Sequence, residues 1–524
     1  MIRNTLRLCL PVVVAGAALM SCMLSCVPGQ EKQDVLYRST PEKEGMRTVG
    51  ILRFLEEVKA RGIDMHSLMI LRRGKVVTEG WSYPYKSGYR HIMHSVSKTF
   101  TSTAIGFAVD EKLLTVDDRV ISFFPDKLPG EVSPYLEELT VKNLLTMSVG
   151  QDPAPDFTLA DGDGDWVKLF LATPIVTRPG TVFLYNSYAS HMLSAIIQKV
   201  TGQTTFDYLK PRLFDPLGIT GEQWETDARG ITMGGWGLRI KTEDMARLGQ
   251  FYLQQGRWNG RQLLSKAWIK EASSLHIFQR DNLTLEEELH DNWVQGYGYQ
   301  IWRCSNNAYR ADGANGQLII VMPEQDAVVV ITENTNDAQQ TMRLVFEYLQ
   351  PVMTQGEYTI REEDSEELSA MLSALSVPDP FRTDEELETP RNTVRSYVME
   401  PNDRQLQSVS FAFDESGDCL LTLTPAGSAP SSFSFGADTW RYGETDCKGP
   451  YFLVPRRNPE GLSPFTVAGY GSWTAGDELR LRLLYIEDYQ EETYICRFYP
   501  DRMEMTLSNN AGSQQSAPLA GRLQ

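Results

Sequence analysis

The spacing of apolar residues divides the chain into a mixed first part and a strand-rich last part. Helices are predicted where apolar residues recur every three or four positions, over 95–114, 190–201, 241–255 and near 336–350. Strands are predicted as a hairpin around the glycine turn in 67–78, and at 298–302, 317–322 and 327–332. Strands at both ends with helices between them predict an α/β (α+β) sandwich, in which an antiparallel sheet flanked by helices is assembled from distant segments.

The last third of the chain has a different pattern. Apolar and polar residues alternate in short segments separated by Gly, Pro, Asp and Asn, as in SVSFAFD, DCLLTLT, ELRLRLLYI, ETYICRFY and MEMTL. This alternation predicts a C-terminal all-β domain over 391–524, barrel- or sandwich-like. Before it, 353–390 is acidic, with 11 acidic residues against two arginines from Glu357 to Glu388. We interpret that segment as a linker or an exposed acidic helix.

Composition and charge narrow the classes of function. With 524 residues, 42% of them hydrophobic and 23% charged, the chain can bury large cores and is expected to form more than one domain. The net charge of −18 argues against a nucleic acid partner, because phosphate binding needs concentrated Lys and Arg. Residues 353–524 hold 14 basic and 28 acidic residues, whereas 1–352 hold 36 and 40. The charge therefore says little about what the first part binds.

The N-terminus has the pattern of an export signal. Arg3 and Arg7 precede an apolar run over 8–20 that is too short to span a bilayer. Cys22 and Cys26 each follow a serine and have Leu or Met three residues upstream, which resembles the lipobox of bacterial lipoproteins. The resemblance implies a signal peptide over 1–22, lipidation of Cys22 in preference to Cys26, and a leader or tether over 23–44. Attachment to a bacterial membrane would then be by the lipid anchor only, on a periplasmic or cell-surface protein; cleavage and release is the alternative.

The remaining cysteines carry no metal-binding pattern. Cys304, Cys419, Cys447 and Cys496 lack the CxxC spacing, and no HExxH motif occurs among the six histidines. We therefore expect no metal and no cofactor. A disulfide among the three C-terminal cysteines and free buried thiols both remain open.

The strongest candidate chemistry lies at the start of the first predicted helix. Ser95 is followed by Lys98, and residues three apart share one face of a helix. A desolvated lysine has a lowered pKa and can take the proton of a serine hydroxyl, which makes the serine a nucleophile. The helix N-terminus adds partial positive charge where an oxyanion would form. We expect this helix to be amphipathic.

The segment that contains this motif is followed along the chain by several others. They are HSVSKTFTSTAIGFAVDEKLL, LTVKNLLTMSVG, PGTVFLYNSYASHMLSAIIQKVTG, DPLGI, GGWGLRIKTEDMARLGQFYLQQG and YRADGANGQLIIVMPEQDAVVV. Together they resemble the serine β-lactamase and penicillin-binding protein superfamily, in particular class C β-lactamase-like esterases and nylon-oligomer-type amide hydrolases. The likeness covers about residues 45–350 and implies a β-lactamase-like serine hydrolase domain over 45–352.

The resemblance also implies roles for individual residues. Ser95 matches the acylated nucleophile, Lys98 its activator, and Tyr185 a general base and acid whose phenol is made acidic by the nearby ammonium. The third position of the tyrosine motif, often Asn in the superfamily, is Ser187, while Asn186 stands in the middle. Which of Asn186 and Ser187 contacts substrate stays open.

A second implied element is the strand that lines the site. The superfamily's Lys-Thr-Gly or His-x-Gly falls on Ala311-Asp312-Gly313, so that Gly313 lets substrate approach and the amides of Ser95 and Ala314 form the oxyanion hole. The lysine that holds the carboxylate of a β-lactam or cell-wall peptide is missing. Arg310 is adjacent and either supplies a cation beside Asp312 or points away by strand alternation.

These residues predict an exported serine acyl-enzyme catalyst. It would pass an acyl group from a small-molecule ester or amide to water, or to a hydroxyl or amine acceptor. A β-lactamase or DD-peptidase acting on cell-wall-like substrates is the alternative among enzymes, and a non-catalytic binding or sensor lipoprotein is the alternative from another class. No GxSxG elbow is present, which disfavours an α/β-hydrolase.

Overall fold

The computed structural model describes most of the chain after residue 35. The described residues are 36–155, 164–280, 282–378, 381, 387, 389–450, 464–511 and 516–524. The predicted signal peptide, Cys22 and Cys26 lie outside them, so their roles stay predictions. Among the described helices, none is both long and apolar enough to cross a membrane.

A six-stranded antiparallel sheet forms the centre of the first part, with strand order β2-β1-β11-β10-β9-β8. Its strands are β1 Met65–Arg72, β2 Lys75–Trp81, β8 Trp302–Arg303, β9 Tyr309–Gly313, β10 Gln317–Met322 and β11 Ala327–Glu333. Ser67 of β1 pairs with Thr332 of β11, so distant segments do assemble one sheet, as the sequence predicted. The strand predicted at 298–302 is wrong except at its last residue. Gln300 there has a φ of +60°, which ends extended pairing, and its backbone N–H donates to the Leu145 carbonyl.

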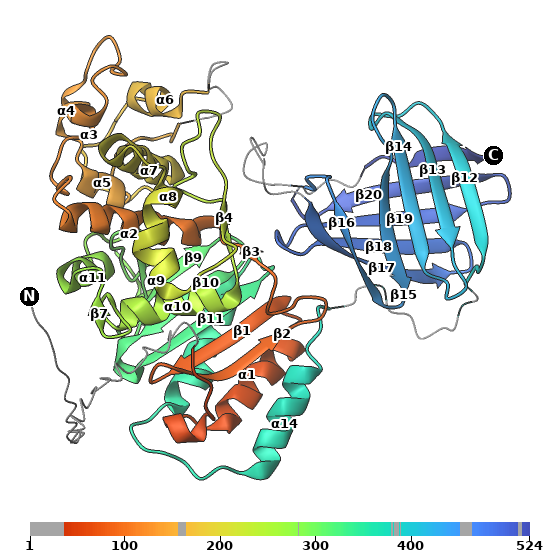
Figure 1. Ribbon diagram of the computed structural model, residues 1–524, viewed down its shortest axis with the longest axis horizontal. Coiled ribbons are helices and arrows are strands. Elements are labelled where there is room, and N and C mark those ends of the chain that lie inside the picture. Colours follow the sequence, from red (N-terminus) through yellow and green to blue (C-terminus); the bar gives the residue numbers. More distant parts are fainter. Residues whose placement is uncertain are drawn as a thin grey trace, which may run out of the picture. The chain divides into compact units, whose positions relative to one another are not determined.

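Helices cover both faces of this sheet (Figure 1). On one face lies α10 (Thr242–Leu253), and on the other lie α1 (Thr48–Ala60), α13 (Ala338–Leu344) and α14 (Glu362–Ser373). Val328 and Val330 of β11 pack into the core on the α10 side, while Val329 and Ile331 pack against the α1 side. Burial on both faces explains why β10 and β11 are continuous apolar runs rather than alternating ones.

The segment between β2 and β8 forms a helical region around α2 (Ser97–Asp110) and α7 (Ser187–Thr201). Its other helices are α3 Val120–Phe123, α4 Pro134–Glu138, α5 Val141–Leu145, α6 Trp166–Ala172, α8 Thr205–Leu209, α9 Asp215–Leu217, α11 Lys266–Ser273 and α12 Leu285–His290. Its short strands are β3 His91–Ile92, β4 Gln223–Trp224, β5 Leu238–Ile240, β6 Arg257–Trp258 and β7 Arg261–Gln262. The helical turns η1 Glu42–Glu44, η2 His94–Val96, η4 Lys210–Phe214, η5 Pro323–Gln325, η6 Val345–Leu349 and η7 Gln350–Val352 complete the first part.

Helix α2 differs from its prediction, because it is central rather than amphipathic. Every residue from Ser97 to Ala108 is buried. Two of its threonines are accommodated by hydrogen bonds, since the hydroxyl of Thr101 donates to the Gly234 carbonyl (2.8 Å) and that of Thr103 donates to the Thr99 carbonyl (2.7 Å). Because these threonine hydroxyls donate to backbone carbonyls, a helix with many polar residues can be buried in the core.

The acidic segment before the last domain contains a helix. Helix α14 packs against α1 and β2 through Leu368, which is buried, while its glutamates face solvent. Of the two interpretations of this segment, the structure gives the acidic helix for 362–373. The positions of the predicted linker at 379–380, 382–386 and 388 lie outside the described residues.

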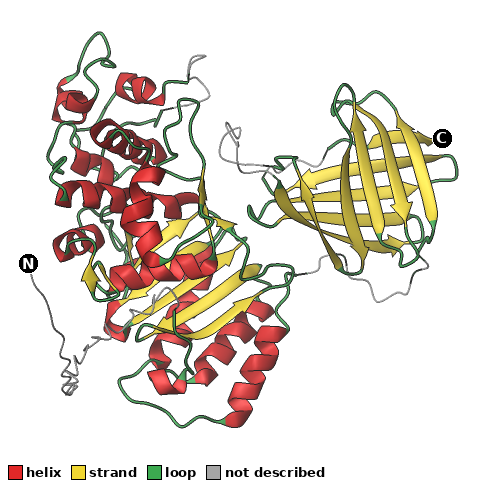
Figure 2. Cartoon of the chain, in the orientation of Figure 1, coloured by secondary structure: helices red, strands yellow, loops and turns green. Residues whose placement is uncertain are grey.

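The last domain is all-β, as predicted, and Figure 2 shows it as strands joined by loops. Its strands are β12 Thr393–Met399, β13 Leu406–Phe413, β14 Cys419–Pro425, β15 Ser431–Ala437, β16 Trp440–Thr445, β17 Phe465–Ala475, β18 Glu478–Tyr485, β19 Glu491–Phe498, β20 Arg502–Asn509 and β21 Leu519–Leu523. A parallel pairing of β15 with β17 closes the sheet into a barrel. Phe411, Phe435 and Leu481 are fully buried in its core. Cys304, Cys419, Cys447 and Cys496 are free thiols.

Candidate active site

The predicted nucleophile and its lysine meet at the start of α2. Ser95 lies in η2, one turn before the regular helix, and is partly exposed, whereas Lys98 is 1% exposed. Lys98 Nζ donates to Ser95 Oγ (2.8 Å) and to the Gly235 carbonyl (2.7 Å). The sequence spacing therefore produces the contact that the chemistry requires.

Burial changes the acidity of Lys98. The loss of water around its amine lowers the pKa from 10.5 to about 7. A substantial fraction of the amine is then neutral near neutral pH. A neutral Lys98 can accept the Ser95 proton while its N–H still donates to Gly235.

Tyr185 completes the group, but its acidity differs from the prediction. Its ring lies 5.0 Å from Lys98 Nζ, stacks on Trp302 at 5.7 Å and is 39% exposed. Desolvation raises the pKa of Tyr185, opposed in part by a hydrogen bond with Ser95. The expectation of an acidified phenol was wrong, because desolvation of Tyr185 outweighs the effects of Ser95 and Arg310, which favour its charged form. A phenol that stays protonated is suited to pass protons between Ser95 and a substrate rather than to hold a negative charge.

The structure separates the roles of the two residues after Tyr185. Asn186 is 2% exposed and caps α7, where its Oδ1 accepts from the backbone N–H of Tyr188 (3.0 Å) and Ala189 (3.3 Å). Its amide Nδ2 donates to Gln151 Oε1 (3.0 Å). Asn186 is thus buried and engaged as a helix cap, which favours Ser187 of the two candidates for the substrate contact. Ser187 remains partly exposed and stays a candidate for that contact.

A glycine pair that the sequence reasoning did not assign holds Lys98 in place. A Cβ on Gly234 would lie 2.2 Å from the Ser190 carbonyl oxygen, and one on Gly235 would lie 2.7 Å from that of Ser187. The two glycines therefore let this segment pass against α7 while the Gly235 carbonyl accepts from Lys98. The signal was present as Gly-Gly-Trp-Gly, but the pattern alone did not show which helix it contacts.

Gly313 makes a close backbone contact that the sequence did not predict. A Cβ there would lie 2.3 Å from the carbonyl oxygen of Met93, two residues before Ser95. Gly313 thus allows a close approach between β9 and the nucleophile segment. Ala314 directly follows β9, and its part in an oxyanion hole stays a prediction.

Arg310 does not face the site. It is 0% exposed, its Nε donates to Asp312 Oδ2 (2.7 Å), and its guanidinium lies 4.6 Å from the Trp293 ring and 5.5 Å from the Trp302 ring. Because it is buried and paired with Asp312, Arg310 is not available as the predicted cation for an anionic substrate. Asp312, 8% exposed, is likewise taken up by this ion pair. The pair supports Trp302, on which Tyr185 stacks.

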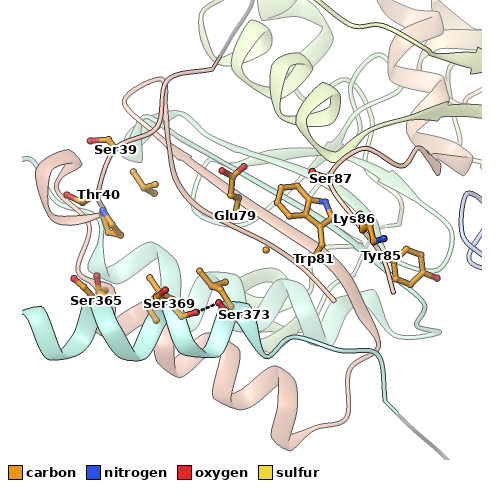
Figure 3. A pocket seen from close by; sticks show the side chains of 16 residues that line it. Ser39, Thr40, Glu79, Trp81, Tyr85, Lys86, Ser87, Ser365, Ser369 and Ser373 are labelled. Carbon is orange, nitrogen blue, oxygen red and sulfur yellow. Dashed lines mark hydrogen bonds between the residues drawn. The ribbon is translucent and has the colours of Figure 1, made fainter. Parts of the chain in front are cut away.

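A separate groove lies away from these residues. It has a volume of about 750 Å³ between β2 and α14, with Glu79 and Trp81 on one side and Ser365, Ser369 and Ser373 on the other (Figure 3). None of the predicted site residues lines it. The chemistry described above therefore does not depend on this groove.

Comparison with known proteins agrees with this geometry. The beta-lactamase family model matches residues 53–350, more than half of the chain. The chain belongs to the beta-lactamase family. It is therefore placed among serine hydrolases that share this fold, and Ser95, Lys98 and Tyr185 all fall inside the matched region.

Parts of the chain are similar to known proteins. It is 25% identical over 285 residues to 6-aminohexanoate-dimer hydrolase of Paenarthrobacter ureafaciens, covering 50% of this chain and 71% of that protein. It is 34% identical over 166 residues to penicillin-binding protein 4 of Amycolatopsis lactamdurans, covering 30% of this chain and 40% of that protein. A solved penicillin-binding protein homologue from Caulobacter crescentus covers 59% of this chain and 99% of its own, with 16% identity and a TM-score of 0.47.

Proposed function

We propose that this protein is an exported serine acyl-enzyme catalyst that transfers the acyl group of a small-molecule ester or amide. The observation that carries the proposal is the contact of Ser95 Oγ with a fully buried Lys98 whose pKa is lowered to about 7. Such a lysine is a base at neutral pH, and the exposed face of Tyr185 leaves the site open to a substrate.

The proposed reaction begins with proton transfer from Ser95 to neutral Lys98. Ser95 Oγ then bonds to the substrate carbonyl carbon, and the carbonyl oxygen gains the negative charge beside the amides of Ser95 and Ala314. The proton moves from Lys98 through the Tyr185 hydroxyl to the leaving alcohol or amine as its bond to carbon breaks. The ester left on Ser95 is attacked by water or by a hydroxyl or amine acceptor, whose proton returns by the same path.

The charges around the site favour substrates without a carboxylate next to the acyl group. Along β9, all of which is described, the charged side chains Arg310 and Asp312 pair with each other. This strand offers no cation to the carboxylate of a β-lactam or a cell-wall peptide. We therefore favour neutral esters and amides over the β-lactamase or DD-peptidase alternative.

Mass spectrometry of the protein after exposure to acyl donors tests the proposal. Activated esters, amides and β-lactams would be added one at a time, with alcohols and amines as acceptors, and products identified. We expect an acyl adduct on Ser95 with esters, slower reaction with β-lactams, and no adduct in Ser95→Ala. Ser102→Ala, a matched change in the same buried helix, should react as the wild type does. Absence of any adduct in the wild type would favour a non-catalytic binding or sensor protein.

Export and lipidation form a separate part of the proposal, which rests on the N-terminal sequence. If Cys22 is acylated, the protein labels with a radioactive fatty acid and partitions with membranes. Cys22→Ala should lose both properties, whereas Cys26→Ala should retain them. The reverse result would move the anchor to Cys26, and labelling of neither would indicate cleavage and release.

A further inference from the structure

The hairpin turn between β18 and β19 of the barrel reaches the catalytic domain. Arg239, on β5, contacts Asp488 of this turn (2.6 Å) and Glu225 (2.8 Å), and all three side chains are at most 2% exposed. Beside this buried group, Arg90 pairs with Glu487 of the same turn at 2.7 Å. These contacts all lie within the compact unit that residues 35–524 form.

Apolar and polar contacts extend the same interface. Tyr85 and Val377 share a buried cluster with Trp440, Leu484 and Ile486 of the barrel. The hydroxyl of Tyr442 donates to the Pro84 carbonyl (2.6 Å). A buried ion pair and an apolar cluster thus contribute to holding the turn against the catalytic domain.

Tyr489, at the end of this turn, contacts residues next to the nucleophile segment and the β9–β10 turn. Its hydroxyl donates to Asn315 Oδ1 (3.0 Å), and its ring centroid lies 5.2 Å from that of His94 in an edge-to-face arrangement. It also stacks on His91 at 6.5 Å. Burial lowers the pKa of His91 to about 3, so that ring brings no positive charge beneath Tyr489.

Two of the residues that Tyr489 contacts, His94 and Asn315, flank the predicted oxyanion hole. His94 immediately precedes Ser95, and Asn315 immediately follows Ala314. Both have a left-handed backbone, with φ of +42° and +62°, and Tyr489 itself has a φ of +53°. Non-glycine residues in this region are held by their surroundings, and such backbone conformations gather at functional sites.

We propose that Tyr489 is a positioning residue of the acyl-transfer site, which holds η2 and the β9–β10 turn so that the amides of Ser95 and Ala314 converge on one oxygen. The barrel then supplies a part of the catalytic cleft from a point almost 400 residues beyond the nucleophile in the sequence. The inference rests on the proposed function, because it concerns the transition state of that same reaction. It gives the barrel a role in catalysis besides any role in stability.

Two variants of the full-length protein separate the contacts of Tyr489. Tyr489→Phe removes the hydrogen bond to Asn315 and keeps the ring on His94, and Tyr489→Ala removes both. The amides of Ser95 and Ala314 would act on the transition state, so misplacing them should change kcat rather than KM. We expect kcat to fall about 10-fold for Tyr489→Phe and about 100-fold for Tyr489→Ala, with KM within about 2-fold of wild type. Affinity for a phosphonate analogue of the tetrahedral intermediate should fall by similar factors. Tyr499→Phe, the same change elsewhere on the barrel, is the control and should leave kcat unchanged.

The readouts separate this inference from the proposed function. Active sites are counted by the acylation burst, so that loss of folded protein does not count as loss of kcat. If the wild type acylates Ser95 and Tyr489→Ala keeps kcat and analogue affinity within about 2-fold, the proposed function stands and the positioning role is refuted. If KM rises while kcat is unchanged, Tyr489 contributes to substrate binding alone and the positioning role is also refuted. If the wild type forms no adduct on Ser95, the proposed function fails and the inference fails with it.

Discussion

Replacing Lys98 by Met should make the protein's stability respond differently to pH. The folded pKa of Lys98 is about 7, against 10.5 for an unburied lysine. Between these values the unfolded chain holds a proton that the folded chain has released, so the contribution of Lys98 to stability improves as pH rises through this window. Below pH 7 both states are protonated, and the dependence on Lys98 levels off.

The size of the effect follows from the two pKa values. The depressed pKa of Lys98 lowers the free energy of unfolding by about 4 kcal/mol at pH 7 and by about 2 kcal/mol at pH 9. The reference is an amine that is neutral in both the folded and the unfolded chain. Met is similar in length and does not ionise, so it removes this cost. It also removes the hydrogen bonds to Ser95 and Gly235, but that loss depends little on pH in this range. From pH 7 to pH 9 the wild type should therefore gain about 2 kcal/mol relative to Lys98→Met.

Urea unfolding of both proteins at pH 7, 8 and 9 measures this difference. Lys199→Met, on the outer side of α7 with half of its side chain exposed, is the matched control and should follow the wild type. Parallel stability curves for wild type and Lys98→Met over this pH range would refute the reasoning, because they would mean that the Lys98 pKa is not depressed on folding.

Three further changes test other parts of the site. Gly313→Ala places a Cβ 2.3 Å from the Met93 carbonyl oxygen, so kcat/KM for an ester should fall at least about 10-fold and the melting temperature should drop; unchanged kinetics would show that β9 need not approach Met93 closely. Asn186→Ala removes a helix cap and should cost about 1 kcal/mol in urea unfolding, with a smaller rise in KM than Ser187→Ala; the opposite order of KM values would restore Asn186 as the substrate contact. Arg239→Leu removes the cation between two buried carboxylates and should cost about 3–5 kcal/mol, measured by urea unfolding, and a cost below about 1 kcal/mol would mean that the interface does not depend on it.

The sequence predicted the elements that local spacing controls. Ser95 and Lys98 are three residues apart on a helix, so their contact follows from helix geometry. Tyr185 was assigned to the same site from the family resemblance, and its ring does lie near Lys98. The hairpin of β1 and β2 and the runs of β10 and β11 were predictable because apolar content and a glycine turn are local signals.

The rest depends on which segments meet, which local patterns do not encode. Arg310 and Asp312 lie two residues apart on one strand. Their ion pair occupies the guanidinium that the sequence offered as a cation for substrate. Asn186 was a candidate for binding substrate, but its side-chain oxygen accepts a hydrogen bond at the N-terminus of α7. Tyr489 stands in an ordinary strand-turn segment, and only the docking of the barrel brings it to Asn315. The predicted acidity of Tyr185 was wrong for a related reason. Burial by surrounding segments lowers the pKa of Lys98 and raises that of Tyr185.

The most direct test of the account is the pH dependence of Ser95 acylation before the steady state. A chromogenic ester would be mixed rapidly with the protein, the burst of leaving group recorded between pH 5 and 9, and the labelled peptide sequenced. We expect an acyl group on Ser95 and a rate that rises about 10-fold per pH unit on the acid side and levels off above an apparent pKa of about 7. A label on another residue, or a rate that is flat through this range or still rising at pH 9, would contradict a nucleophile activated by the neutral amine of Lys98.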